Sequence, residues 1–207
     1  MSTLSQILEH KIIAIIRGVQ PADVLRLTEA MYAGGIRLLE VTMNSAEPLA
    51  VIKEVSAKMG DKMIIGAGTV LDAATARAAA AAGARFILSP ILEPEVIRTA
   101  RELGVVSIPG AYTATEIYAA CKQAADMIKV FPATSPAYIK DISAPLPKMH
   151  LLPTGGITPE NIKDFQQAGA AGFGIGSALV NAKTAVTPEY LQQLTEKSQQ
   201  FIRAIQS

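Results

Sequence analysis

The sequence predicts an α/β fold, a (β/α)8 or TIM barrel, and three observations support this prediction. Short runs rich in Val, Ile, Leu and Phe alternate with longer stretches that are rich in Ala and Glu and have apolar residues at helical spacing. The short runs are continuously apolar, which is typical of parallel strands covered on both faces. Eight such runs occur, each with a helical stretch after it, and eight βα units close into a barrel.

The eight predicted strands comprise residues 12–17, 38–42, 63–68, 86–88, 105–109, 127–131, 151–154 and 172–176. Helix starts are indicated at Pro21, at Asp72 before residues 73–82, in the capping box Thr113-Ala-Thr-Glu116, and at Thr158, which precedes Pro159. Helix ends are indicated at Gly34-Gly35, Gly60, Gly83, Gly104 and Gly169. Residues 1–207 are expected to form one barrel domain.

The main alternative is a doubly wound open sheet, which usually has five or six strands and a Gly-rich turn after the first. Here the first predicted strand ends in Ile16-Arg-Gly-Val-Gln20, which has no GxGxxG pattern. Both the strand count and this turn favour the barrel. A chain of 207 residues is short for that fold and therefore requires small loops.

Composition argues against several classes of partner. The net charge is +1, so neither nucleic acid nor an acidic membrane surface is expected to bind. No stretch of 18 or more apolar residues occurs, so no membrane span is expected. A lone cysteine, Cys121, cannot form an internal disulfide, which fits a reducing cytoplasm. The two histidines, His10 and His150, lie far apart in sequence and form no metal-binding motif.

Three charged residues lie within or at the end of predicted strands. Lys129 lies in Met127-Ile-Lys-Val-Phe131, Glu40 lies in Leu38-Leu-Glu-Val-Thr42, and Arg17 ends the first strand. Burying an ammonium without a partner is costly. The second and sixth strands face each other across a barrel, and barrel active sites lie at the C-terminal ends of the strands. Lys129 and Glu40 are therefore expected to meet near the axis, either as a catalytic pair or as a buried ion pair without chemistry.

A lysine and a carboxylate in such a place favour covalent carbonyl chemistry. Burial favours the neutral amine, which can condense with a ketone to give an electron-withdrawing iminium. Glu40 could shuttle protons in these steps, directly or through a water molecule. Two other functions are compatible with the pattern. One is a phosphosugar isomerase or epimerase in which Lys129 only stabilises an enolate, and the other is a phosphosugar sensor without catalysis.

Two glycine-containing loops are predicted to bind phosphate. Pro153-Thr-Gly-Gly156 follows the seventh predicted strand and Gly174-Ile-Gly-Ser177 ends the eighth, each before a predicted helix start. Phosphate sites in barrels are commonly built from these two loops, whose backbone N–H groups can approach a ligand closely. The expected donors are Gly155, Gly156, Gly176 and Ser177.

Other strand ends are expected to line the substrate site. Arg17 is the best carboxylate ligand by chemistry, although it could also pair with Glu40. Thr69 follows the glycines of the third strand and could hold a carboxylate or carbonyl oxygen. Pro90 and Phe131 end further strands and are expected to shape the pocket.

Together these segments resemble the family of 2-keto-3-deoxy-6-phosphogluconate (KDPG) aldolases. The matching motifs are Ile13-Ala-Ile-Ile-Arg17, Leu39-Glu-Val-Thr42, Ile65-Gly-Ala-Gly-Thr-Val70, Leu88-Ser-Pro90, Ile108-Pro-Gly110, Lys129-Val-Phe-Pro132, Pro153-Thr-Gly-Gly156 and Gly174-Ile-Gly-Ser177. They follow the order of the predicted strands and cover almost the whole chain. The resemblance implies a TIM-barrel class I lyase that uses no metal or other cofactor and assembles as a homotrimer.

The resemblance also implies roles for individual residues. Lys129 would form the Schiff base and Glu40 would be the general acid and base. The products would be pyruvate and an aldehyde, which is D-glyceraldehyde 3-phosphate for the phosphorylated sugar acid. Arg17 and Thr69 would hold the pyruvate carboxylate. The distal hydroxyls and the phosphate would face Thr154, Gly155, Gly156 and Ser177.

Two motifs leave the substrate open. Many gluconate-type members of the family carry an arginine shortly after the glutamate motif, whereas this chain has Thr42-Met-Asn-Ser45, which resembles the galactonate-type relatives. Pro153-Thr154 resembles the gluconate type instead, whose threonine contacts a substrate hydroxyl. The preferred C4 epimer is therefore open, as is an unphosphorylated 4-hydroxy-2-oxo acid. The missing arginine makes Arg17 more important as a carboxylate ligand.

Overall fold

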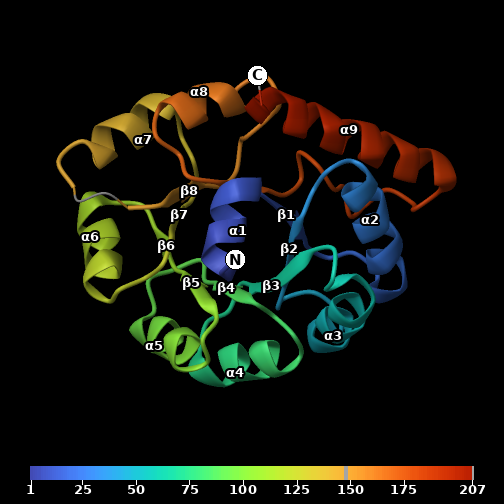
Figure 1. Ribbon diagram of the computed structural model, residues 1–207, viewed down its shortest axis with the longest axis horizontal. Coiled ribbons are helices and arrows are strands. Elements are labelled where there is room, and N and C mark those ends of the chain that lie inside the picture. Colours follow the sequence, from blue (N-terminus) through green and yellow to red (C-terminus); the bar gives the residue numbers. More distant parts are fainter. Residues whose placement is uncertain (147–148, 207) are drawn as a thin grey trace.

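The computed structural model, which describes residues 1–146 and 149–206, has the predicted (β/α)8 barrel (Figure 1). Its strands are β1 (Ile12–Ile16), β2 (Leu38–Thr42), β3 (Ile64–Gly68), β4 (Phe86–Leu88), β5 (Val106–Ile108), β6 (Gly110–Ala111), β7 (Ile128–Val130), β8 (Leu151–Pro153) and β9 (Phe173–Ile175). The pairings are parallel and give the orders β5-β4-β3-β2-β1-β9 and β6-β7-β8.

Two joints close these strands into a ring. The fifth barrel strand is divided by Pro109 into β5 and β6, rather than being the single run 105–109 that the sequence predicts. Proline lacks a backbone N–H and cannot donate to the ladder, but the Pro109 carbonyl still accepts from the N–H of Lys129 at 2.9 Å. On the other side, a parallel bridge between Thr154 and Gly174 joins β8 to β9.

Helices surround the ring, and several begin at the predicted capping signals. They are α1 (Thr3–His10), α2 (Pro21–Ala33), α3 (Pro48–Met59), α4 (Ala73–Ala81), α5 (Pro94–Glu102), α6 (Ala114–Lys122), α7 (Pro136–Ser143), α8 (Ile162–Gln167) and α9 (Pro188–Gln206). Thr113 and Glu116 form the predicted capping box of α6, and the Asp72 side chain accepts from the Thr75 N–H at the start of α4. Within the described residues, none of these helices is long and apolar enough to cross a membrane.

Two predicted helix starts are wrong because hydrogen-bonded turns occupy those positions. After β8, the Asn161 side chain accepts from the Thr158 N–H at 2.8 Å and donates to the Gly156 carbonyl at 2.9 Å, and α8 begins only at Ile162. After β9, residues 177–179 form a turn, and the N–H groups of Leu179 and Val180 donate to the Gly176 carbonyl. The two glycine loops therefore precede turns, and the helix-terminus argument for phosphate binding does not apply to them.

Helix α1, which the sequence did not predict, covers the N-terminal opening of the barrel (Figure 1). Its Ile7 is fully buried and packs in one cluster with Ile13, Leu38 and Phe86. This apolar cluster fills the barrel interior at that end. Because alternate strand residues share a face, the next inward-facing layer begins two residues further along the strands, and Glu40, two residues after Leu38, lies in it.

Candidate active site

A cavity of about 460 Å³ lies at the C-terminal ends of the barrel strands. Every predicted site residue except Glu40 lines it: Arg17, Thr69, Pro90, Lys129, Phe131, Thr154, Gly155, Gly156, Gly176 and Ser177. These residues come from six different parts of the chain and meet because parallel strands present their C-terminal ends at one face. The predicted site is therefore a single pocket in the fold.

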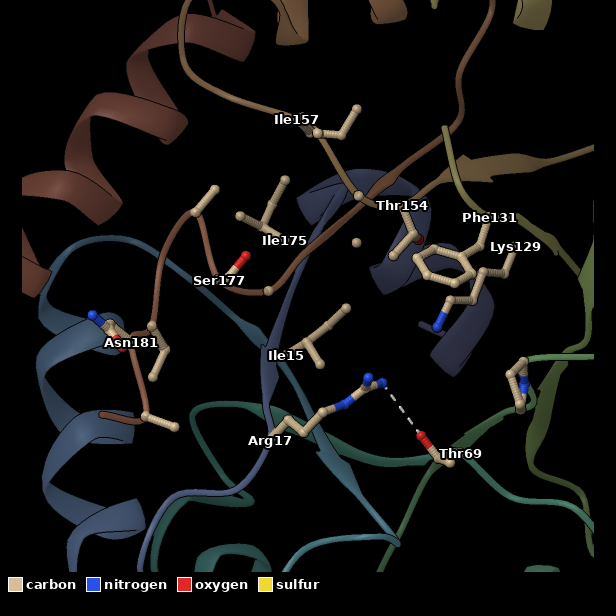
Figure 2. A pocket seen from close by; sticks show the side chains of 18 of the residues that line it. Ile15, Arg17, Thr69, Lys129, Phe131, Thr154, Ile157, Ile175, Ser177 and Asn181 are labelled. Carbon is tan, nitrogen blue, oxygen red and sulfur yellow. Dashed lines mark hydrogen bonds between the residues drawn. The ribbon is translucent and has the colours of Figure 1, made fainter. Parts of the chain in front are cut away.

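Lys129 reaches the cavity because strand β7 alternates its side chains. Ile128 and Val130 pack in the large cluster beneath the helices, so Lys129 between them points to the barrel interior. Its residue is only 4% exposed, and its Nζ lies 5.5 Å from the centre of the Phe131 ring. Figure 2 shows the Lys129 amine projecting into the cavity beside that ring. An amine held in this way can reach the carbonyl carbon of a bound ligand.

Glu40 lies deeper, fully buried on the inward face of β2. Its neighbours Leu39 and Val41 face the helices. Both carboxyl oxygens of Glu40 are buried and have no hydrogen-bond partner in residues 1–146 and 149–206. The alternative of an ion pair is not realised, because neither Lys129 nor Arg17 forms a salt bridge with Glu40 within the part of the chain that the structure describes.

The electrostatic environment of Glu40 favours its protonated form. Burial raises the pKa of this carboxyl above its ordinary value, and this effect exceeds the opposite influence of the positive charges on Lys129 and Arg17. A carboxyl whose pKa is raised holds its proton more readily than an ordinary glutamate does, and can therefore act as a proton donor as well as an acceptor. Lys129 and Arg17 are therefore both near enough to Glu40 to interact with it electrostatically.

Arg17 and Thr69 meet at the mouth of the cavity. The Arg17 Nη2 donates to the Thr69 Oγ1 at 3.5 Å, the interaction drawn as a dashed line in Figure 2. Figure 2 also shows the guanidinium and the Lys129 amine reaching into the cavity from different sides. Thr69 has a φ of +59°, a left-handed conformation that is uncommon for a β-branched residue. Such residues concentrate at ligand sites, where the surrounding fold maintains the conformation.

The two glycine loops form the other wall of the cavity. Gly155 and Gly156 have φ angles of +86° and +71°, which glycine adopts without the penalty that a Cβ would bring. Thr154 is 4% exposed, and a Cβ at Gly174 would lie 2.3 Å from its Oγ1, so the glycine makes room for the threonine. This loop therefore offers a backbone that can approach a ligand and one hydroxyl in a fixed place.

The lining residues that the sequence analysis missed include Asn181, Ala182 and Lys183. These three residues lie in a turn after β9 that helix α9 stabilises, because the Asn181 N–H donates to the Tyr190 hydroxyl of α9 at 2.9 Å. No local motif signals such a contact. With Lys183, the described lining carries three cations and no carboxylate. The cavity thus suits a ligand with negative charge at more than one end.

The chemistry of the donors favours organic catalysis by side chains. Within the described residues, no three side chains of His, Cys, Asp or Glu come together as a metal site would require. The cavity offers one amine, two further cations and several hydroxyl and backbone groups, and the Glu40 carboxyl is buried in the barrel interior outside the lining. These are the groups needed to form an iminium and to move protons around it.

Comparison with known proteins identifies the family to which this chain belongs. A family model described as KDPG and KHG aldolase matches residues 4–196. The chain belongs to this family. It is therefore an aldolase, a carbon–carbon lyase, and the isomerase, epimerase and sensor alternatives lose their support.

Relatives of this aldolase include enzymes with different named substrates. The 2-dehydro-3-deoxy-6-phosphogalactonate aldolase of Escherichia coli (strain K12) is 36% identical over 93% of each chain. The 2-dehydro-3-deoxy-phosphogluconate aldolase of Pseudomonas aeruginosa is 37% identical over 76% of this chain and 72% of its own length. The KDPG aldolase of Legionella pneumophila, solved with pyruvate captured as a covalent carbinolamine, is 28% identical, with a TM-score of 0.85 over 96% of this chain and 97% of that one.

Proposed function

We propose that this protein is a class I aldolase that cleaves KDPG into pyruvate and D-glyceraldehyde 3-phosphate through a Schiff base on Lys129. The observation that carries the proposal is a lysine that is almost fully buried, projects into the cavity and acts electrostatically on a fully buried glutamate. The carbinolamine captured in the Legionella pneumophila relative supports the same type of intermediate. No cofactor is needed, because the iminium itself accepts the electrons.

The proposed reaction starts with attack of the Lys129 amine on the C2 ketone of the substrate. The carbinolamine loses water and becomes an iminium with a positively charged nitrogen. A base then removes the C4 hydroxyl proton, the C3–C4 bond breaks, and its electron pair moves to the iminium to form an enamine. The aldehyde leaves, C3 of the enamine takes up a proton, and water releases pyruvate and the free amine.

Glu40 is proposed to move the protons of this sequence. It can donate to the departing water and accept from the C4 hydroxyl, directly or through a water molecule. The raised pKa of Glu40 suits the donor role, since burial favours the protonated carboxyl. Because its two oxygens have no hydrogen-bond partner among the described residues, both can bond to substrate or water.

Binding is proposed to use the two walls of the cavity. Arg17 and Thr69 would hold the substrate carboxylate, while the phosphate would lie against Gly155, Gly156, Gly176 and Ser177. Thr154 would contact a hydroxyl between the two ends, and Pro90 and Phe131 would limit the width of the pocket. The support for this division is the distribution of charge, with cations on both sides and no acid in the described lining.

The 6-phosphogalactonate epimer is the second candidate substrate. It is favoured by Asn44-Ser45, which stands where gluconate-type enzymes carry an arginine, and by the E. coli relative. The experiment is a comparison of kcat/KM for the two C4 epimers and for 4-hydroxy-2-oxoglutarate. A higher kcat/KM for the gluconate epimer supports the proposal. A preference for the galactonate epimer reassigns the substrate, and cleavage of none of the three refutes the proposed function.

We also propose that the active form is a homotrimer. Three large apolar side chains that follow β2, β3 and β4 are exposed: Leu49 in the first turn of α3 at 38%, and Leu71 and Ile91 in the loops after β3 and β4, each at 51%. Contact between copies would remove them from water. Sedimentation equilibrium of the wild-type protein should give three times the mass of one chain, and a monomer at assay concentration would contradict this assembly.

A further inference from the structure

Ser45 connects the loops that follow the first two barrel strands. Its Oγ accepts from the N–H of Gly18 at 3.0 Å and lies 2.9 Å from the Oγ1 of Thr42. Thr42 is fully buried at the end of β2 and is therefore a fixed anchor. The hydroxyl pair thus attaches the loop after β1 to the end of β2.

The attached loop is the one that carries Arg17. Gly18 follows Arg17 directly and has a φ of +68°, so the chain turns sharply at this point. Among the described residues, the guanidinium makes one side-chain hydrogen bond, the 3.5 Å contact with Thr69. A contact of that length positions a long side chain only weakly. The direction of Arg17 therefore depends mainly on the backbone that Ser45 holds.

We infer that Ser45 is a positioning residue that fixes the Arg17-Gly18 turn and so aims the guanidinium at the substrate carboxylate. The inference rests on the proposed role of Arg17 and adds a residue that does not itself line the cavity. Ser45 therefore acts on substrate binding and not on bond cleavage.

The test is a double-mutant cycle of Ser45→Ala and Arg17→Met, with KM and kcat measured on the better sugar-acid substrate. Ser45→Ala should raise KM about 5-fold, the effect of one net hydrogen bond, and should leave kcat within about 2-fold. Ser45→Thr keeps the hydroxyl and should restore most of the affinity. In the Arg17→Met background the same Ser45→Ala change should have almost no effect, because the group that it positions is gone.

A matched control is Ser2→Ala, which removes the same type of bond, from the Ser5 N–H to the Ser2 hydroxyl, at the far end of the barrel. It should change neither kinetic constant. Equal losses from Ser45→Ala in both backgrounds, an unchanged KM, or a loss confined to kcat would each overturn the inference. A wild-type enzyme that cleaves no sugar acid would refute the proposed function instead, so the two failures are distinguishable.

Discussion

Gly68 leaves open the space that the Glu40 side chain fills. A Cβ at position 68 would lie 1.7 Å from the Oε1 of Glu40 and 2.3 Å from its carboxyl carbon. The two residues are on the neighbouring strands β3 and β2, two steps apart along the barrel in their register. The Glu40 side chain therefore explains why residue 68 is a glycine, and the position of the Glu40 carboxyl depends on Gly68.

Gly68→Ala should therefore lower activity far more than its effect on folding would suggest. The added methyl displaces the carboxylate, and a shift of about 1 Å at a reacting group can cost about 100-fold in kcat/KM. The overpacking should lower the free energy of unfolding by about 1–3 kcal/mol. The control is Gly66→Ala on the same strand, whose Cβ would meet the Phe86 ring at 2.2 Å instead. If both variants lost activity equally, a specific effect on Glu40 would be excluded.

Glu40→Gln should gain stability relative to the wild type as the pH rises. The pKa of Glu40 is raised in the folded protein, so the folded state keeps its proton at pH values where the unfolded state has released it. Rising pH then favours unfolding of the wild type, by up to about 1.4 kcal/mol per pH unit above the ordinary glutamate range. The glutamine variant lacks this titration.

Urea unfolding of both proteins at a series of pH values from acid to neutral measures this difference. The free energy of unfolding of the variant minus that of the wild type should increase through the window between the ordinary and the raised pKa, and should level off below it. A difference that does not depend on pH would show that Glu40 titrates normally.

Thr154→Val should reduce discrimination between the C4 epimers. The substitution keeps the shape of the side chain but removes the hydroxyl, which Gly174 allows to lie at the cavity wall. If that hydroxyl bonds to the substrate, kcat/KM for the preferred epimer should fall about 5-fold to 10-fold, while the other epimer changes less. Equal losses for both epimers would indicate a role in shaping the wall only.

The barrel and most of the cavity could be predicted because their signals are local. Lys129 and Glu40 were recognisable as charges inside apolar strands, and the strand order then placed them on opposite sides of one barrel. The roles of these residues stay predictions until they are tested. The division at Pro109 was not predicted, because residues 105–109 were expected to form one strand and the continuation into Gly110 and Ala111 depends on pairing with β7.

The features that sequence analysis missed depend on contacts between distant segments. Helix α1 is short and mostly polar, and its place follows from Ile7 fitting the barrel opening. The helix expected to start at Thr158 does not form there, because the Asn161 side chain bonds to the Thr158 N–H and the Gly156 carbonyl. The sequence around Asn161 does not indicate these bonds. Lys183 reaches the cavity rim in a turn that Tyr190 holds from α9.

The most direct test of the account is covalent capture at Lys129. The protein is incubated with pyruvate and borohydride, and its peptides are mapped by mass spectrometry. The account predicts a single reduced pyruvate adduct on Lys129, and no adduct in Lys129→Ala, which should still unfold cooperatively because the change removes a buried amine. An adduct on another lysine, no adduct at all, or sustained carbon–carbon cleavage by Lys129→Arg would contradict it.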